Sequence, residues 1–210
     1  MKIITNTYRI TIIMLLSFIL FTCSDEKQTD KVPDEVLDKA AAQMQNFVIN
    51  ISNYARGYNL NFIIIPQNAV ELAFNNAEPK DGLNLSYMNA VNGFGVEELF
   101  YNGAYDLDNE RLSILKQLKS TKKIMVSEFV TDKKYISDAY TKNYNEGFIT
   151  FVRNSSNYYY NQIPDTIPYE NTNNINDLSL ANNYLYLINP EKFTTKQEMI
   201  NAISKTNFDV

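Results

Sequence analysis

Polar side chains follow two apolar segments of this chain, and they are the residues best placed to do chemistry. Gln67 and Asn68 come directly after the apolar run 62–66, and Glu97 lies within the segment 92–103. In an α/β protein this order delivers side chains to the carboxyl edge of a parallel sheet, where ligands bind. The chain has no histidine, so a Ser-His-Asp mechanism is excluded. These two segments supply the carboxylates and amides that any remaining chemistry would need.

Paired carboxyl groups are typical of glycoside hydrolysis, which needs an acid and a nucleophile or base beside the scissile bond. Glu97 and Glu128 are the two candidates, since Glu128 also lies near the end of an apolar run. Gln67, Asn68 and Tyr101 could bind sugar hydroxyls or orient a carboxylate. Simpler roles remain open: a helix first turn for Glu97, a structural hydrogen bond for Glu128, a helix cap for Asn68, and packing for Tyr101.

Metal and nucleotide sites find no support in the sequence. The chain has no histidine and one cysteine, Cys23, and its acidic residues lack the spacing of a calcium-binding loop. Gly93-Phe94-Gly95 lacks the third glycine and the helix start of a dinucleotide-binding motif. We therefore expect neither a metal nor a cofactor.

The N-terminus has the pattern of a bacterial signal peptide over residues 1–22. Lys2 and Arg9 accompany an apolar run, 10–21, that is too short to span a bilayer comfortably. Its end, with the sequence LFTC, resembles a lipobox, which implies that Cys23 is lipidated. An ordinary signal peptide or an N-terminal anchor helix is the alternative.

Removal of residues 1–22 would leave 17 basic and 24 acidic residues, a net charge of −7. This charge argues against a nucleic-acid partner and against electrostatic adhesion to anionic lipid. Residues 23–33 are polar and are expected to form a flexible tether. The acidic residues after Cys23 resemble export signals of surface lipoproteins. We therefore expect a lipid-anchored protein of the bacterial cell envelope, at the outer membrane, with surface exposure as one option.

The rest of the chain alternates strand-like and helical segments, which indicates βαβ units and a parallel sheet. The expected strands are 62–66, 90–96, 123–130, 147–152 and 183–188, with a further strand opening at 208–210. The expected helices are 33–58, one that begins near residue 70, 108–120, 132–145 and 195–206. Residues 154–176 show no usable period and are expected to form a long loop.

The first expected helix carries one apolar stripe, a pattern typical of a helix that packs this stripe against a core. The stripe consists of Val36, Leu37, Ala40, Met44, Phe47, Val48, Ile51 and Ala55. Pro33 suits the first turn of this helix, and Gly57 suits its end.

Several of these segments together resemble a known family. The helical residues 44–56, the strand 62–68 and the segment 92–103 are similar to the endo-α-1,4-polygalactosaminidase-like proteins, glycoside hydrolase family 114. The strand 123–129, with its acidic residue near the end, fits the same family. The resemblance covers roughly residues 40–152 and implies a TIM barrel.

A second similarity lies out of order. Residues 183–187, the helix after them and residues 207–210 look like the first strand, first helix and second strand of the family, although here they come last. The resemblance thus implies a circularly permuted, incomplete (β/α) barrel that lacks strands two to four. Residues 34–153 would hold strands five to eight, 154–182 would be a linker, and 183–210 would hold the first strand.

The resemblance also implies a function. It places a catalytic glutamate at Glu97 and makes a galactosamine-containing polysaccharide the expected substrate. Ala69 replaces a usual glycine, and the acidic residue of strand four has no counterpart, so half of the active site is absent. We expect a lipid-anchored, glycoside-hydrolase-like protein completed by a second chain or a longer reading frame. The alternative is a non-catalytic surface lipoprotein that binds glycan or a protein partner.

Overall fold

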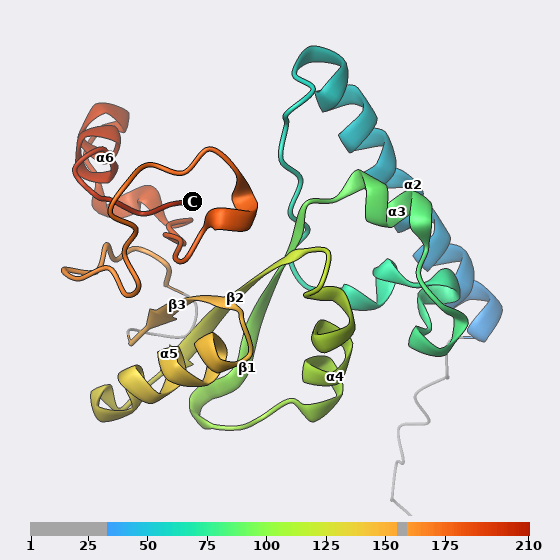
Figure 1. The fold of residues 1–210 in the computed structure, drawn as a ribbon, viewed down its shortest axis with the longest axis horizontal. Coiled ribbons are helices and arrows are strands. Elements are labelled where there is room, and N and C mark those ends of the chain that lie inside the picture. Colours follow the sequence, from blue (N-terminus) through green and yellow to red (C-terminus); the bar gives the residue numbers. More distant parts are fainter. Residues whose placement is uncertain (1–32, 155–158) are drawn as a thin grey trace, which may run out of the picture. The chain divides into compact units, whose positions relative to one another are not determined.

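The structure, a computed structural model, describes residues 33–154 and 159–210. Residues 35–210 form one compact unit (Figure 1). The predicted signal peptide, the lipidation residue Cys23 and all of the predicted tether except Pro33 lie outside the described residues. Within the described ranges, no helix is both long and apolar enough to cross a membrane.

A parallel sheet, three-stranded within the described residues, forms the centre of this unit. β1 (Gly93–Tyr105), β2 (Lys123–Val130) and β3 (Ile149–Arg153) lie side by side in that order. α4 (Asn109–Leu118) connects β1 to β2, and α5 (Ile136–Asn145) connects β2 to β3. The predicted α/β fold with parallel strands and intervening helices is confirmed.

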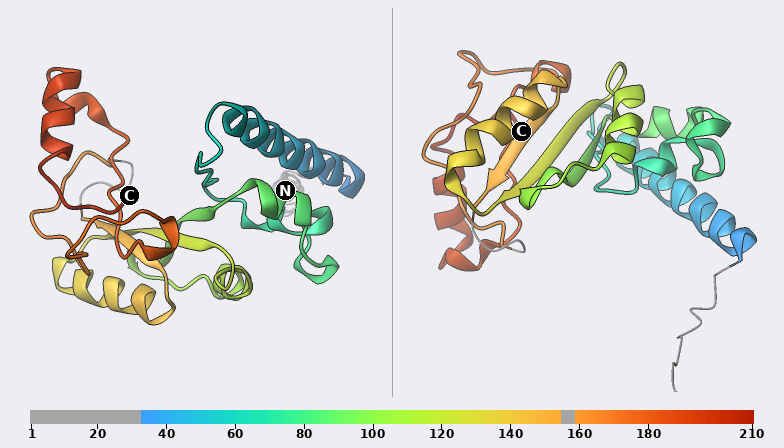
Figure 2. Two further views of the ribbon diagram at one scale, coloured as in Figure 1. Left: turned by 45° about the horizontal axis from the view of Figure 1, so that its top comes forward. Right: turned by 90° about the horizontal axis from the view of Figure 1, so that it is seen from below.

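The two faces of the sheet pack against different layers, as Figure 2 shows. One face, called the helical face, shares a core with the helices through Phe94, Val96, Ile124, Val126, Val130 and Val152. The other, called the C-terminal face, packs under the last part of the chain through Met125, Ile149, Phe151, Tyr160, Ala181 and Tyr184. Successive side chains of a strand point to opposite faces. Glu97 and Ser127, which are paired in register, therefore belong to the C-terminal face, and Glu128 belongs to the helical face.

The predicted strand 62–66 does not form a regular strand, although it lies parallel to β1. The carbonyl oxygens of Ile64 and Pro66 accept hydrogen bonds from the backbone N–H groups of Asn92 and Gly95, at 2.7 and 2.8 Å. The pairing is interrupted at Pro66, which has no N–H to donate, and it continues with a hydrogen bond of 2.7 Å from the N–H of Asn68 to the carbonyl oxygen of Gly95. The N–H of Ile64 donates instead to the Asn92 side chain at 2.9 Å.

The predicted strands 183–188 and 208–210 are also absent from the described sheet, which corrects the predicted count of five strands and a sixth begun. The two segments are joined by a backbone hydrogen bond of 2.8 Å from the N–H of Leu185 to the carbonyl oxygen of Val210. A single bond of this kind does not make a ladder, so both segments remain irregular.

The C-terminal region otherwise follows the prediction. α6 (Lys196–Ile203) falls within the predicted helix, and the Thr195 side chain caps its first turn. The described part of 154–176 contains neither helix nor strand, which confirms a long loop there. Two short 3₁₀ turns, η5 (Leu178–Leu180) and η6 (Pro190–Lys192), also lie in this region. A further 3₁₀ turn, η4 (Lys133–Tyr135), directly precedes α5.

The helix predicted to begin near residue 70 is replaced by short turns. They are η1 (Val70–Ala73), η2 (Asn75–Ala77) and η3 (Pro79–Asp81), and α3 (Leu85–Ala90) follows them. Asn76 has a positive φ of 54°, a left-handed conformation that a continuous helix does not accommodate. Pro79 then prevents a helix from running through from the preceding turn.

α2 (Asp34–Tyr58) matches the predicted helix, but it buries a different face from the predicted one. Gln45 and Ser52 are 7% and 0% exposed, whereas Phe47 of the apolar stripe is 59% exposed. Gln45 donates two hydrogen bonds to backbone carbonyl groups at η1, and Ser52 donates one to the carbonyl of Ala90. Carbonyl groups at helix ends lack helical partners, so the polar residues of α2 take the buried side.

Candidate functional site

The regular pairing of β1 with β2 ends at Glu97. The ladder runs from Gly93 to Glu97 and resumes only at Asn102. Glu98 has a φ of 58°, a left-handed conformation that is uncommon for a residue with a side chain. Bulges of this kind re-aim side chains and are frequent beside functional sites. The first candidate carboxylate therefore stands at an irregularity near the carboxyl edge of the sheet.

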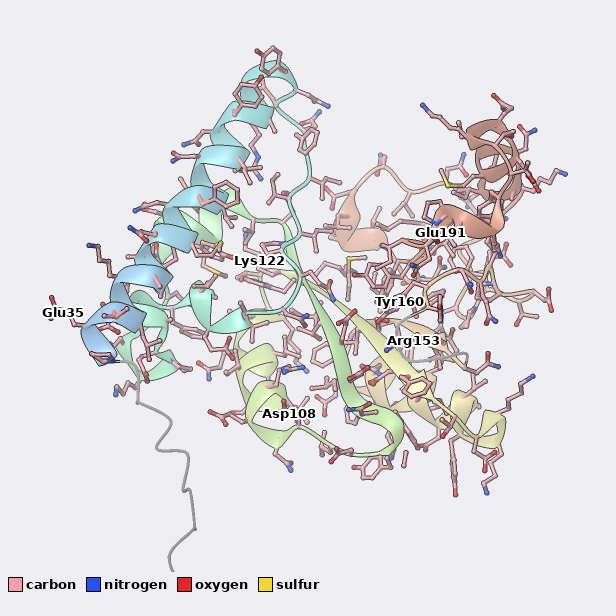
Figure 3. The ribbon with its side chains drawn as sticks, turned by 180° about the vertical axis from the view of Figure 1, so that it is seen from behind. Glu35, Asp108, Lys122, Arg153, Tyr160 and Glu191 are labelled. Atoms are coloured by element: carbon pink, nitrogen blue, oxygen red, sulfur yellow. The ribbon has the colours of Figure 1, made fainter. Side chains whose placement is uncertain are left out.

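A buried tyrosine holds the Glu97 carboxylate. The Tyr160 hydroxyl donates a hydrogen bond to Glu97 Oε1 at 2.7 Å. The hydroxyl oxygen of Tyr160 also accepts hydrogen bonds from Ser127 Oγ at 3.1 Å and from Arg153 Nη1. Figure 3 shows Arg153 and Tyr160 next to each other. Burial raises the pKa of the Tyr160 hydroxyl far above its ordinary value, so the phenol stays protonated and serves as a donor.

Glu98 joins the same group, although regular alternation along β1 would point its side chain to the opposite face from Glu97. Its Oε1 forms an ion pair with Arg153 Nη2 at 2.7 Å, in which the Arg153 side chain is 2% exposed and the Glu98 side chain 27%. The left-handed backbone at Glu98 explains the difference, because it breaks the alternation of side chains along β1. The set Glu97, Glu98, Ser127, Arg153 and Tyr160 is called the Glu97 cluster below.

Arg153 is the one cation of the Glu97 cluster, and it is enclosed by its neighbours. Its guanidinium carbon lies 4.2 Å from the centre of the Tyr160 ring and 5.3 Å from that of Phe129. Its Nε is buried without a hydrogen-bond partner. One buried positive charge thus faces two carboxylates, so the formal charge of the Glu97 cluster is negative.

Glu128 lies on the helical face and is fully buried. Its carboxylate accepts hydrogen bonds of 3.0 Å from the backbone N–H groups of Phe100 and Tyr101, and one of 2.8 Å from Asn143 Nδ2. Phe100 and Tyr101 lie where β1 has left the ladder, so the carboxylate satisfies N–H groups that the bulge releases. Burial raises the pKa of Glu128, and the donated hydrogen bonds oppose that rise. These contacts make Glu128 a support for the bulge, while its catalytic role stays a prediction.

Gln67 and Asn68 lie beside the backbone of Glu97. Asn68 Oδ1 accepts a hydrogen bond from the N–H of Glu97 at 3.2 Å, and the Asn68 N–H donates to the carbonyl of Gly95 at 2.7 Å. Gln67 is exposed and bridges to Gly95. Ala69, where the resembling family has glycine, adopts a φ of 49°. The structure therefore brings both amides to the edge where Glu97 lies, and substrate binding by them stays a prediction.

Tyr101 is buried, and the contacts described here are with residues outside the Glu97 cluster. Its hydroxyl donates a hydrogen bond to the Asp138 carboxylate on α5, and its ring lies 5.5 Å from that of Tyr105. Burial, followed by the hydrogen bond to Asp138, raises the pKa of Tyr101 far above its ordinary value. These contacts tie β1 to α5, and the predicted binding role of Tyr101 stays a prediction.

Sequence reasoning missed three members of the Glu97 cluster: Ser127, Arg153 and Tyr160. Arg153 ends the buried strand β3, and a charged residue at the end of an apolar run is a signal for it. Ser127 is recognisable only from the register that pairs it with Glu97. Tyr160 follows a segment without any period, so no local pattern locates it.

The Glu97 cluster combines a carboxylate, a protonated phenol and a buried guanidinium. This combination can bind a polar or cationic group and can exchange a proton at Glu97. Among the residues that the structure describes, no group of three or more histidine, cysteine, aspartate or glutamate side chains is arranged to hold a metal ion.

Comparison with known proteins gives a distant similarity. No family model matches this chain. The chain is similar to the uncharacterized protein MJ1477 of Methanocaldococcus jannaschii, with 33% identity over 131 residues. The match covers 56% of this chain and 36% of the archaeal protein, so this chain matches little more than a third of that relative. The similarity assigns no activity.

Proposed function

We propose that this chain is a glycoside-hydrolase-like protein that acts on an amino-sugar polysaccharide, with Glu97 as a reacting carboxyl group. The observation that carries the proposal is the position of that carboxylate. It stands where the ladder between β1 and β2 is interrupted, before the pairing resumes at Asn102, and it accepts a hydrogen bond of 2.7 Å from the protonated Tyr160. Barrel enzymes place their catalytic groups at the carboxyl ends of their strands.

The finer fold in this proposal is an incomplete, permuted (β/α) barrel. Residues 62–67 lie parallel to β1, so four parallel segments follow one another as strands five to eight of a barrel would. The hydrogen bond between Leu185 and Val210 fits the start of pairing between a first and a second strand. Because a barrel closes only with its full set of strands, the missing ones would come from a second chain or a longer reading frame.

In this site Glu97 supplies one of the two carboxyl groups that glycoside hydrolysis requires. As an acid it gives its proton to the glycosidic oxygen, and as a base it takes a proton from water. Tyr160 holds the Glu97 carboxylate in place through its hydroxyl. The segment that completes the barrel supplies the second carboxyl group, since Glu128 is enclosed in the core.

The substrate class follows from the family resemblance and fits the charge of the chain. A polymer of galactosamine with free amino groups is cationic at neutral pH. The chain has a net charge of −5, and Glu97 and Glu98 outnumber Arg153 in the cluster. Opposite charges favour the encounter of such a polymer with this site.

The proposed location is the outer membrane of a bacterial cell envelope, through a lipid on Cys23. In cells fed a labelled fatty acid, we expect label on the wild-type chain, and its recovery in the membrane fraction. Cys23→Ala should lose the label and leave that fraction. A labelled, membrane-bound Cys23→Ala chain would contradict the anchor without bearing on the site.

The activity is tested on the chain produced from its own locus, so that any completing segment is present. Envelope fractions are incubated with galactosaminogalactan, and the release of reducing ends is measured. We expect Glu97→Gln to abolish the release. Glu110→Gln, which removes an exposed carboxylate on α4, should release as much as the wild type. Equal release by the Glu97→Gln chain would remove Glu97 from the proposal.

A second candidate function is glycan binding without cleavage. It is favoured by the ion pair that engages Glu98 with Arg153 and by the burial of Glu128, which leave Glu97 without an available second carboxylate in the described residues. In the same fractions this function predicts retention of the polymer by the wild-type chain without any release of reducing ends.

A further inference from the structure

The outward face of α2 has the spacing of a coiled-coil seam. Its members are alternately three and four residues apart: Leu37, Ala40, Met44, Phe47, Ile51, Tyr54 and Tyr58. All of them are exposed. This is the a/d pattern with which one helix packs along another, and it continues over the length of the helix. These residues are called the α2 seam below.

The α2 seam is more apolar than a solvent-facing surface normally is. Tyr54 and Tyr58 are 71% and 81% exposed, and Leu37 is 51% exposed. α2 has 25 residues, which at 1.5 Å per residue make a stripe about 37 Å long. A contiguous apolar patch of this extent on a soluble domain marks an interaction surface.

The carboxyl half of the α2 seam is hollowed and can receive side chains from a facing helix. A groove of about 710 Å³ is lined by apolar and aromatic residues, among them Phe47, Ile51, Tyr54, Tyr58 and Phe62. The rings of Tyr54 and Tyr58 lie 5.1 Å apart and form one wall of it. Knobs of one helix pack into holes of this kind on another.

The charges beside the α2 seam indicate which partner fits it. The positions that flank a seam select partners by their charge. Here one flank consists of Gln43, Asn50 and Gly57, and the other of Ala41, Val48 and Ala55, of which Ala41 and Val48 also pack against the core of this chain. These flanking positions carry no charged residue that would favour a partner of opposite charge. Two copies of an acidic chain can therefore meet along this surface without repulsion between like charges.

We propose that two copies of this chain associate through their α2 seams as a two-fold symmetric helix pair. Such an interface uses the same patch on both copies and would bury the apolar stripe that α2 leaves in water. The inference does not depend on the proposed hydrolase function, because it uses no residue of the Glu97 cluster.

Sedimentation velocity of the purified full chain tests this inference. We expect the wild type to be a dimer at about 10 µM. The dissociation constant of the Phe47→Glu dimer should be at least about 100-fold higher, because a carboxylate would have to be buried in the interface. Ile51→Gln, which adds no charge, should weaken the dimer in the same direction. Asn46→Glu is the matched control, because it places the same charge on α2 beside the seam and should leave the dimer intact.

Circular dichroism of each variant shows whether α2 stays folded, as its exposed position leads us to expect. A wild-type chain that stays monomeric at and above this concentration would overturn the proposal. So would a Phe47→Glu or Ile51→Gln chain that is folded and dimerises as tightly as Asn46→Glu.

Discussion

Tyr160 connects the members of the candidate site through a single oxygen atom. That oxygen donates to Glu97 and accepts from Ser127 and Arg153. The hydroxyl therefore fixes the Glu97 carboxylate and at the same time accepts a hydrogen bond from Nη1 of the buried Arg153 guanidinium. Buried donors that lose their acceptor cost more than an average hydrogen bond contributes, so this tyrosine should matter for stability as well as for the site.

Replacing Tyr160 with phenylalanine tests this linkage. Tyr160→Phe keeps the ring but removes the acceptor of Ser127 Oγ and leaves Arg153 Nη1 with its longer hydrogen bond of 3.3 Å to Ser127 Oγ. We expect the free energy of unfolding to fall by about 1–3 kcal/mol. Urea unfolding measures the change. Tyr105→Phe, at an exposed tyrosine, is the control and should stay within about 0.5 kcal/mol of the wild type. Equal stability of the two variants would contradict the assigned network.

Glu128 should give stability a pH dependence of definite sign. Burial raises its pKa in the folded chain above the ordinary value of 4.5. The folded state then binds a proton more tightly than the unfolded state, so the stabilisation is present below 4.5 and is lost as pH rises through the folded pKa. We expect the unfolding free energy of the wild type, relative to Glu128→Gln, to decrease over the pH interval above 4.5, until the folded chain has lost this proton. An increase over that interval would refute the sign.

At the scale of elements, the sequence predicted β2, β3, α4 and α5 well, because their apolar periods match their burial. α2 was predicted as a helix with the wrong buried face. Its inward polar residues donate hydrogen bonds to carbonyl groups of segments far away in the sequence, and the apolar period of α2 gives no information about those partners. The backbone conformation of Glu98 and the register of the strands likewise depend on contacts between segments that are distant in the sequence. The sequence therefore located Glu97 but could not show that Glu98 joins it or that Glu128 faces away.

Two glycines of β1 should differ in their tolerance of a methyl group. A Cβ at Gly93 would lie 2.6 Å from the backbone carbonyl oxygen of Lys123, whereas one at Gly95 would lie 2.0 Å from the exposed side-chain oxygen of Gln67. The sheet backbone cannot move away, but the Gln67 side chain can. We expect urea unfolding to show a loss of about 3 kcal/mol for Gly93→Ala and about 1 kcal/mol for Gly95→Ala. The reverse order would show that Gln67 is held rigidly.

At the scale of the whole molecule, the described residues form a three-stranded parallel sheet with a helical layer and a C-terminal layer. The extended segments 62–66 and 183–188 lack full ladders, and α2 leaves an apolar face in water. The apolar, β-branched composition of such segments indicates that they are buried, and a sequence pattern therefore predicts strands. A regular strand also needs a neighbouring strand to hydrogen-bond with, which composition does not indicate. An incomplete barrel gives one account of the two segments without full ladders, and it would place the Glu97 cluster at a rim that further strands would close.

The most direct test of the proposed activity follows the oxygen of water into the product. Hydrolysis of a glycosidic bond puts one water oxygen at the new reducing end. Envelope fractions from cells with the wild-type allele, incubated with galactosaminogalactan in ¹⁸O-labelled water, should yield oligosaccharides that carry the label, measured by mass spectrometry. The Glu97→Gln allele should yield none. Label at the same level from both alleles, or no labelled oligosaccharide from the wild type, would contradict hydrolysis by Glu97.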